Sequence, residues 1–180
     1  MDTEQTPWKK VKEEVAYRGY RSMLRRTYEF PGDRRAVFDI IQNDPFVCVA
    51  AFDLDGSAIL VRQFRPGPEK PLLSFPEGYI EPGESPAMAG ARELLEETGF
   101  RAGKIEFLKE IRTAYSTERK LCVLAVDCQK TDVPRPDPNE FIQTVLMPVD
   151  ELRSRMRDSG RDAFSSVDAA YLALDRLDKL

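Results

Sequence analysis

Three glutamates in one short segment carry the clearest chemistry in the sequence. Glu93, Glu96 and Glu97 are spaced i, i+3 and i+4, and residues with this spacing are neighbours on the surface of a helix. Three such negative charges repel one another unless a cation lies among them. Because carboxylate oxygens suit Mg²⁺ and Mn²⁺, which commonly bind substrate phosphates as well, the cluster indicates a divalent metal site. The alternative is an acidic helix face that is simply solvated.

The helix predicted for this segment has clear end signals. Ser85 is a favourable N-cap, Pro86 suits the first helical position, and Gly99 can end the helix in a left-handed conformation. These signals predict a helix over residues 86–98. Its apolar face, opposite the glutamates, would consist of Ala87, Met88, Ala91, Leu94 and Leu95.

Gly90 lies inside this helix, where it costs about 1 kcal/mol relative to Ala. Its missing side chain leaves room either for a metal or a phosphate, or for close packing against a neighbouring element. Arg92 directly precedes the cluster and can orient a carboxylate, and Glu84 lies just before the helix. These details favour a functional site over a solvated face.

The segment GYIEPGESPAMAGARELLEETGF, residues 78–100, resembles the signature of the Nudix hydrolases. The matching positions are Gly78, Glu84, Arg92, Glu93, Leu94, Glu96, Glu97, Gly99 and Phe100. The resemblance implies an α/β fold, namely an α/β/α sandwich with a mixed sheet. It also implies hydrolysis of a diphosphate linked to another moiety, with Mg²⁺ or Mn²⁺ held by the helix glutamates.

The composition restricts the chemistry further. The chain has 180 residues, of which 42% are hydrophobic and 32% charged, as expected of a soluble globular domain. Its net charge of −4 does not suggest a general nucleic-acid binder. The absence of histidine excludes Ser-His-Asp and Cys-His mechanisms and His-ligated zinc. Acid–base work must therefore fall to carboxylates, tyrosine, lysine or metal-bound water.

We expect a cytoplasmic protein without a membrane partner. No apolar run approaches the roughly eighteen residues that span a bilayer, and the opening segment MDTEQTPWKK lacks a signal-peptide core. The cysteines are odd in number and lie in apolar stretches, so they are predicted to be buried free thiols; they are Cys48, Cys122 and Cys128.

The order of elements predicts an N-terminal β extension, residues 1–43, that is part of the same domain as a core over 44–180. VKEEVAYRGYRSMLRRTYEF, a Pro-Gly-Asp turn and RRAVFDII predict two or three antiparallel strands. A sheet this small usually needs a partner surface, here a second subunit. Most arginines near the N-terminus are then expected on a solvated strand face.

The core is predicted to contain strands over 46–52 and 58–65, a short LLSF strand, two strands over 104–114 and 120–128, and a strand in FIQTVLMPV. Asp150 is expected to open a short helix. A final amphipathic helix after Gly160 would place on its core face Phe164, Val167, Ala170, Tyr171, Leu174 and Leu177.

Within the Nudix hydrolases, the chain is most similar to the ADP-ribose and nucleoside-diphosphate-sugar pyrophosphatases, through its VRQFR strand end, its PEG entry to the signature and its Ser-Thr-Glu loop. The resemblance implies a homodimer that exchanges its N-terminal strands. It implies that Arg65 faces the diphosphate and that Arg35 of a partner subunit approaches the base. Phe30 and Tyr28 are candidate stacking groups.

The same resemblance implies that Glu118 approaches the metal site from a mobile loop and helps to activate water; the alternative is an exposed loop residue. Glu140 is a weaker metal-site candidate. One departure concerns the Ser-Pro-Gly of the subgroup, which Thr113, Ala114 and Tyr115 replace. A tyrosine at this place is more similar to the diadenosine-polyphosphate hydrolases, so Tyr115 is a candidate for substrate selectivity.

The expected mechanism is attack by water on one phosphorus of a diphosphate. Glu93 and Glu97 would bind the metal, with Glu96 as third ligand or base and the main chain near Glu77 completing the shell. Arg65 would hold a phosphate and Arg92 would orient the carboxylates. The expected substrate is a nucleoside diphosphate sugar such as ADP-ribose, giving a nucleoside monophosphate and a sugar phosphate. Dinucleoside polyphosphates, nucleoside triphosphates and a non-catalytic nucleotide-binding regulator are the alternatives.

Overall fold

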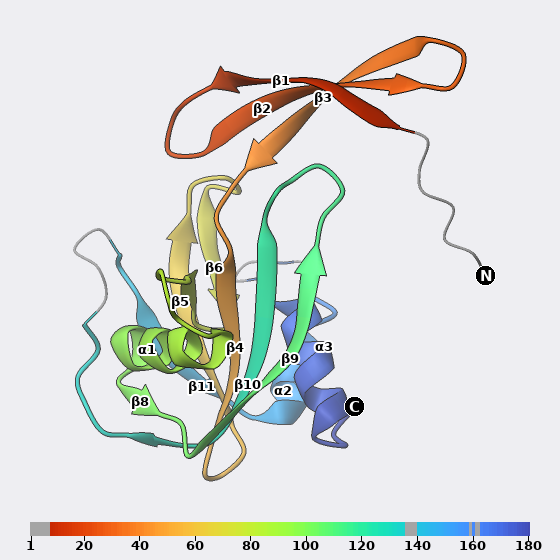
Figure 1. Ribbon diagram of the computed structural model, residues 1–180. Coiled ribbons are helices and arrows are strands. Elements are labelled where there is room, and N and C mark those ends of the chain that lie inside the picture. Colours follow the sequence, from red (N-terminus) through yellow and green to blue (C-terminus); the bar gives the residue numbers. More distant parts are fainter. Residues whose placement is uncertain (1–7, 136–139, 159, 161–162) are drawn as a thin grey trace. The chain divides into compact units, whose positions relative to one another are not determined.

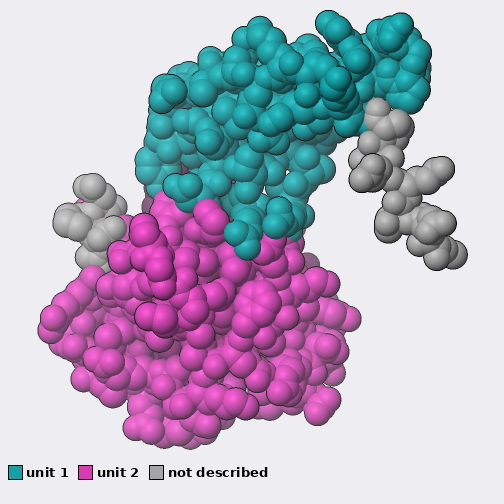
Figure 2. Space-filling model, viewed as in Figure 1, with its two compact units in different colours: residues 1–44, 112–119 teal, residues 45–111, 120–180 magenta. Residues whose placement is uncertain are grey.

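The computed structural model describes residues 8–135, 140–158, 160 and 163–180. The chain divides into two units, shown in Figure 2. Unit 1 consists of residues 1–44 and 112–119, and unit 2 consists of residues 45–111 and 120–180. The short loop 112–119 therefore belongs with the N-terminal extension, although almost seventy residues separate them in the sequence.

Unit 1 contains three antiparallel strands in the order β1-β2-β3 (Figure 1). They are β1 (Lys9–Tyr17), β2 (Ser22–Phe30) and β3 (Arg34–Gln42). The β2–β3 pairing is regular from end to end, from Ser22 opposite Gln42 to Phe30 opposite Arg34. At the predicted turn between them, Gly32 and Asp33 have φ angles of 80° and 57°, which glycine and aspartate tolerate better than most residues.

Unit 2 is built on a mixed eight-stranded sheet with the order β11-β5-β4-β10-β8, and with β6, β7 and β9 paired to β5, β4 and β10. Its strands are β4 (Phe46–Asp53), β5 (Ala58–Arg65), β6 (Lys70–Ser74), β7 (Glu77–Tyr79), β8 (Phe100–Arg101), β9 (Lys104–Arg112), β10 (Arg119–Lys130) and β11 (Gln143–Met147). β4 is parallel to β10 and antiparallel to β5. β4 is almost continuously apolar because both of its faces are covered.

Helices cover both faces of this sheet: α1 (Pro86–Thr98) on one face, and α2 (Val149–Arg155) and α3 (Val167–Arg176) on the other. Alternate residues of β4 divide between the two layers. Val47 and Val49 belong to one buried cluster with Leu94 of α1. Cys48 and Ala50 belong to a second buried cluster with residues of α2 and α3. The predicted α/β/α sandwich with a mixed sheet and an N-terminal antiparallel sheet is therefore confirmed.

The ends of α1 agree with the prediction. The Ser85 hydroxyl accepts a hydrogen bond from the Met88 N–H at 3.2 Å, and Gly99 ends the helix with a φ of 76°. The predicted apolar face is wrong in part, because the exposed side chains include Met88 and Ala91, whereas the buried positions are Ala89, Gly90, Leu94, Glu97 and Thr98. The prediction from hydrophobicity alone placed the buried face incorrectly, because it took every glutamate of the helix to be exposed.

Gly90 packs closely against the sheet. A Cβ atom added there would lie 2.8 Å from Val123 Cγ2, 3.2 Å from Ile105 Cδ1 and 3.4 Å from Val49 Cγ2. Of the two interpretations offered by the sequence, these distances support close packing rather than space for a ligand.

Gly90→Ala is therefore expected to lower the free energy of unfolding by about 1 kcal/mol. The helix gains about 1 kcal/mol in propensity, but overpacking against the stiff side chain of Val123 costs about 1–3 kcal/mol. Urea unfolding of the variant measures the balance. Gly67→Ala is the control, because no atom of the residues that the structure describes lies within 4 Å of the added atom. A more stable Gly90→Ala variant would mean that the sheet can move aside.

The C-terminal region differs from its prediction in detail. α3 begins at Val167, so Phe164 lies outside the helix, where it is buried and forms an isolated β-bridge with Leu73. Tyr171 is 56% exposed rather than on the core face. The three cysteines are buried and unpaired, as predicted. Within the residues that the structure describes, no helix is both long enough and apolar enough to cross a membrane.

Candidate active site

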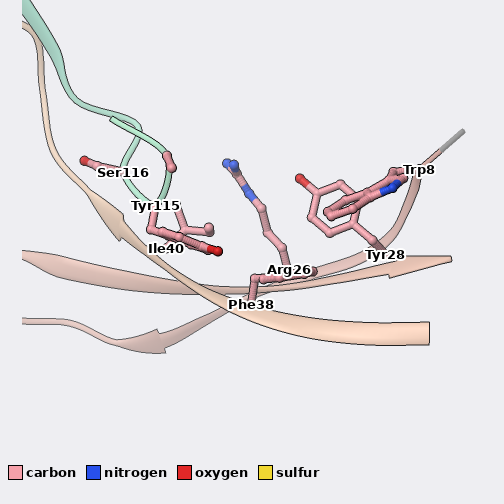
Figure 3. Close-up of a pocket in the computed structure, with 8 residues that line it drawn as sticks. Trp8, Arg26, Tyr28, Phe38, Ile40, Tyr115 and Ser116 are labelled. Atoms are coloured by element: carbon pink, nitrogen blue, oxygen red, sulfur yellow. The ribbon is translucent and has the colours of Figure 1, made fainter. Parts of the chain in front are cut away.

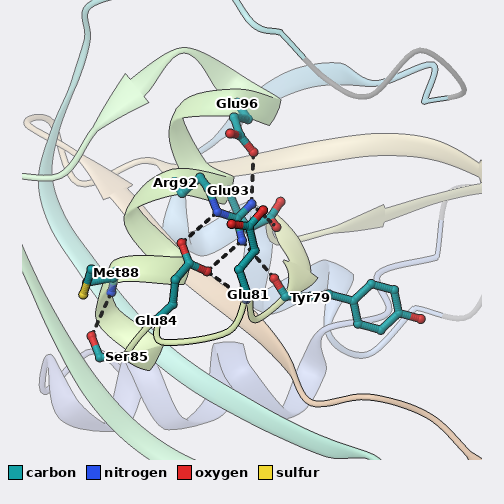
Figure 4. Close-up of polar contacts among 8 residues, drawn as sticks. All are labelled: Tyr79, Glu81, Glu84, Ser85, Met88, Arg92, Glu93 and Glu96. Carbon is teal, nitrogen blue, oxygen red and sulfur yellow. Dashed lines mark hydrogen bonds and ion pairs between the residues drawn. The ribbon is translucent and has the colours of Figure 1, made fainter.

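Arg92 organises the polar contacts at the start of α1 (Figure 4). Its Nε and Nη2 atoms donate to the two carboxylate oxygens of Glu84 at 2.9 and 3.0 Å. Nη1 donates to Glu93 Oε1 at 2.7 Å and to Glu96 Oε2 at 3.1 Å, and Nη2 also donates to the Tyr79 carbonyl at 2.9 Å. The hydrogen bonds to Glu84, followed by those to Glu93 and Glu96, raise the pKa of the guanidinium above its ordinary value. Arg92 thus fixes two of the glutamates and the loop before the helix.

Glu84 forms the other end of this arrangement. Its carboxylate accepts from the Glu81 N–H at 3.0 Å, and its own N–H donates to the Glu81 carbonyl at 3.0 Å. The hydrogen bonds from Arg92 lower the pKa of Glu84, so it remains a carboxylate. The loop 80–85 is therefore tied to α1 by a charged pair whose geometry is bidentate.

Glu97 is a buried carboxylate, only 4% exposed. One of its oxygens accepts from the Glu77 N–H of β7 at 3.2 Å. Burial raises its pKa well above the usual value, and the negative charges of Glu93, Glu140 and Glu77 add to the effect. Burial also raises the pKa of Glu93, although Arg92 opposes the shift. A cation among these carboxylates would relieve both the repulsion and the loss of hydration.

β7 passes close to these side chains. A Cβ atom on Gly78 would lie 2.1 Å from both Cδ and Oε1 of Glu93, so the carboxylate occupies the space that a larger residue would fill. The neighbouring Glu77 carboxylate pairs with Arg65, whose Nη2 lies 2.9 Å from Glu77 Oε1. Glu77 therefore contacts the glutamate cluster through its main chain and Arg65 through its side chain.

The groups gathered here are buried or half-buried carboxylates beside the backbone of β7, which has no side chain at Gly78. Such oxygen donors fit a hard divalent cation. Arg92 holds the carboxylates of Glu93 and Glu96. Across the described ranges, 8–135, 140–158, 160 and 163–180, no three Asp, Glu, Cys or His side chains already converge as a metal cage.

Unit 1 contains an aromatic pocket of about 410 Å³. Figure 3 shows Arg26 extending between the ring of Tyr28 and the loop that carries Tyr115 and Ser116. The Phe38 ring stacks on Trp8, with centroids 5.7 Å apart, and on Tyr115, with centroids 6.3 Å apart. The lining residues are Trp8, Arg26, Tyr28, Phe38, Ile40, Ala114, Tyr115 and Ser116.

A family model for the NUDIX domain matches residues 43–167 of this chain. The chain is 32% identical to the ADP compounds hydrolase NudE of Escherichia coli (strain K12) over 158 residues, which cover 86% of this chain and 78% of that protein. The chain belongs to the Nudix family. It is a Nudix pyrophosphatase, a hydrolase that acts on phosphorus-containing acid anhydrides.

Two further comparisons agree with this assignment. The chain is 35% identical to the ADP-sugar pyrophosphatase of Mus musculus over 126 residues, which cover 64% of this chain but only 56% of the mouse protein. A solved structure titled as the crystal structure of an ADP compounds hydrolase superposes with a TM-score of 0.84 at 26% identity. The superposed region covers 99% of this chain and 100% of the chain in the solved structure.

The residues predicted for the Nudix metal site gather on α1 and β7. Glu93, Glu96 and Glu97 lie on one helix, and the Glu77 main chain contacts Glu97. Arg65, predicted to hold a phosphate, pairs with Glu77 in the same unit. Their roles as ligands and catalytic groups remain predictions.

The two loop glutamates fall in different units. Glu118 belongs to unit 1, where its carboxylate accepts from Asn43 at 2.6 Å and from Arg21 at 3.3 Å. Glu140 belongs to unit 2, where its charge contributes to raising the pKa of both Glu93 and Glu97. Glu140, the weaker candidate from the sequence, therefore acts electrostatically on the glutamates of α1.

The predicted substrate-binding residues of unit 1 divide between the two faces of the β2–β3 hairpin. Arg26 lies opposite Phe38 on the face with the pocket. Phe30 is on the same face, because side chains alternate between the two faces along a strand. The centroid of its ring lies 4.5 Å from that of Trp8. Arg35 lies opposite Glu29 on the other face, 64% exposed, with its Nη2 2.8 Å from the Glu29 carboxylate. The hairpin thus separates Arg35 from the pocket residues, including Tyr115.

The pocket residues that were not singled out from the sequence as binding groups include Trp8, Arg26 and Phe38. A signal was present, because Arg26, Tyr28 and Phe30 alternate along one strand and must share a face. What the sequence did not contain was the β2–β3 register, which places Phe38 beside Arg26.

Proposed function

We propose that the protein hydrolyses the diphosphate bond of a nucleoside diphosphate sugar such as ADP-ribose, giving a nucleoside monophosphate and a sugar phosphate. The observation that carries the proposal is the buried carboxylate of Glu97, which lies among further carboxylates. It accepts a hydrogen bond from the main chain of Glu77, whose side chain pairs with Arg65. The names of the mouse and E. coli relatives, an ADP-sugar pyrophosphatase and an ADP compounds hydrolase, support this choice of substrate.

Glu93 and Glu97 would hold Mg²⁺ or Mn²⁺, with Glu96 as a third ligand or as the base and the main chain of β7 beside them. A divalent ion there supplies charge neutralisation at the phosphoryl oxygens and a lowered pKa for water. Arg92 orients Glu93 and Glu96 through its Nη1 donors. We propose Glu118 as the additional carboxylate that activates water, with Glu140, whose charge acts on Glu93 and Glu97, as the alternative.

Arg65 would bind the phosphate that is not attacked. Its side chain is 34% exposed, and its Nη2 atom is already held by Glu77. This pairing limits the conformations of the arginine before substrate binds, so less side-chain entropy is lost on binding.

The aromatic pocket would bind the nucleobase. Stacking of a base on an aromatic ring contributes about 1–3 kcal/mol and does not depend strongly on the base. A pocket of about 410 Å³ has the size of typical small-molecule sites. Tyr115 is 61% exposed and stacks on Phe38, which also favours a second candidate substrate class, the dinucleoside polyphosphates, whose second base could use an additional ring.

We further propose a cytoplasmic homodimer formed through the N-terminal strands. All nine residues of β1 are exposed, and exposed apolar side chains of unit 1 include Val11, Val15, Tyr17, Met23 and Val37. A three-stranded sheet of this kind gains stability from a second surface.

The buried free cysteines suit a reducing compartment. With a net charge of −4, no nucleic-acid partner is proposed.

The test is hydrolysis of a substrate panel with Mg²⁺ and with Mn²⁺, with products separated by chromatography. ADP-ribose is expected to give AMP and ribose phosphate. Excess EDTA is expected to abolish turnover, and added Mg²⁺ to restore it, because the carboxylates cannot activate water alone. Preferential cleavage of dinucleoside polyphosphates would support the second class. Absence of turnover with sugar nucleotides, dinucleoside polyphosphates and nucleoside triphosphates would contradict the proposed activity.

A further inference from the structure

Loop 112–119 is attached to the end of β3 by main-chain hydrogen bonds. The Ile41 N–H donates to the Tyr115 carbonyl at 2.9 Å, and the Thr117 N–H donates to the Ile41 carbonyl at 2.9 Å. Ile41 and Ser116 form an isolated parallel β-bridge. These contacts lie entirely within unit 1, so the loop is held as a short extension of the N-terminal sheet.

Asn43 extends this attachment with three further hydrogen bonds. Its main-chain N–H donates to Thr117 Oγ1 at 3.1 Å, and its carbonyl accepts from the same hydroxyl at 3.1 Å. Its side-chain amide donates to Glu118 Oε2 at 2.6 Å. Arg21 also donates to this oxygen, but at 3.3 Å and with a side chain that is 52% exposed. An exposed pair of this kind contributes little to stability, whereas the short bond to a partly buried amide is the stronger contact.

The same loop lines the aromatic pocket. Ala114, Tyr115 and Ser116 contribute to its wall, and Glu118 is only two residues further along. The position of the Tyr115 ring therefore depends on how the loop is attached at Thr117 and Glu118.

We propose that Asn43 is a positioning residue for ligand binding: by holding Glu118, it fixes the loop so that Tyr115 completes the aromatic pocket. This inference rests on the proposed nucleotide-binding role of that pocket. It gives Glu118 a structural function that is separate from any part in hydrolysis.

Asn43→Asp tests the inference, because it replaces the amide donor by a second carboxylate 2.6 Å from Glu118. Repulsion between the two groups should release the loop and weaken ligand binding about tenfold, a change of about 1.4 kcal/mol. Adding Glu118→Gln to this variant restores the hydrogen bond in the opposite direction, because the new amide at position 118 donates to the new carboxylate at position 43. The double variant is therefore expected to bind within about twofold of the unmodified protein.

Trp8 provides the measurement. It is the only tryptophan of the chain, and it lines the pocket and stacks on Phe38. Its fluorescence is titrated with ADP-ribose in EDTA, so that binding is read without turnover. Gln42→Glu is the matched control, because it makes the same amide-to-acid change at the adjacent, exposed position; it is expected to leave binding unchanged.

Thermal unfolding of each variant establishes that it is folded. If Asn43→Asp does not fold, Glu118→Ala replaces it, since it removes the acceptor without adding charge and should weaken binding to a similar extent. Binding by Asn43→Asp at the unmodified affinity, or no recovery in the folded double variant, would overturn the positioning role. Failure of ADP-ribose to change Trp8 fluorescence in the unmodified protein would instead remove the nucleotide-binding role of the pocket, and this inference with it.

Discussion

Glu97→Gln is expected to lower kcat for ADP-ribose with Mg²⁺ by about 10²- to 10³-fold, the size of effect seen when one preorganised electrostatic group is lost from an active site. Glutamine has nearly the same shape and keeps an oxygen that can accept from the Glu77 N–H. What it removes is one negative charge from the proposed metal site. Steady-state kinetics over a range of Mg²⁺ concentrations measures the loss.

The stability of this variant separates a catalytic effect from a folding effect. Glu97 is buried among like charges, so removing its charge should leave the melting temperature in EDTA unchanged or raise it. Added Mg²⁺ should stabilise the unmodified protein by binding to its folded state, and should stabilise Glu97→Gln much less. Near-normal turnover in Glu97→Gln would exclude the proposed role.

Glu151→Gln is the matched control for Glu97→Gln. Glu151 is also a helical glutamate, but it is exposed on α2 and pairs with Arg155 across one helical turn. A surface pair of this kind contributes at most about 0.5 kcal/mol. This variant is expected to keep both its kcat and its response to Mg²⁺.

Gly78→Ala is expected to lower kcat by about 10- to 100-fold, comparable to the loss of groups that orient metal ligands. The added Cβ would overlap the Glu93 carboxylate, only 2.1 Å away. β7 cannot easily withdraw, because Gly78 pairs with Val47, which is fully buried in the central strand. The Glu93 side chain must therefore rotate away, and its hydrogen bond to Arg92 is lost or altered.

This variant alters the site without changing any charge, and its fold should be preserved because the displaced atoms are the end of a flexible side chain. The same measurements apply: kcat at saturating Mg²⁺, the Mg²⁺ concentration for half-maximal activity, and thermal unfolding. Gly67→Ala serves as the control glycine, because the added atom meets no neighbour within the described part of the chain. Full activity in Gly78→Ala would show that the observed position of Glu93 is not required.

The Nudix helix could be predicted almost completely from the sequence. Its cap, its first proline and its terminal glycine act through contacts within four residues of the chain, and each is found as expected at Ser85, Pro86 and Gly99. The i, i+3, i+4 spacing of the glutamates is likewise a property of the helix alone. The central strands were also predictable, because burial on both faces leaves a continuous apolar run such as β4.

The apolar face of the helix could not be predicted in the same way. Amphipathic patterning assumes that charged residues are exposed, yet Glu97 is buried and Met88 is 59% exposed. Burial of Glu97 depends on the Glu77 N–H of β7, twenty residues away. No local pattern contains that information.

By itself, the sequence determined the central strands, the extent of the signature helix and the set of glutamates that it carries, because these follow from short-range backbone preferences and the burial of apolar residues. The sandwich arrangement was what the resemblance to the Nudix hydrolases implied. Only the tertiary structure decided how those glutamates are used: Glu97 buried beside β7, Glu93 in the space left by Gly78, and Arg92 joining them to Glu84. It also decided that Trp8, Phe38 and Tyr115 form one pocket and that Asn43 holds Glu118. The physical reason is that these contacts join segments up to about a hundred residues apart, whose register is set by the packing of the whole chain.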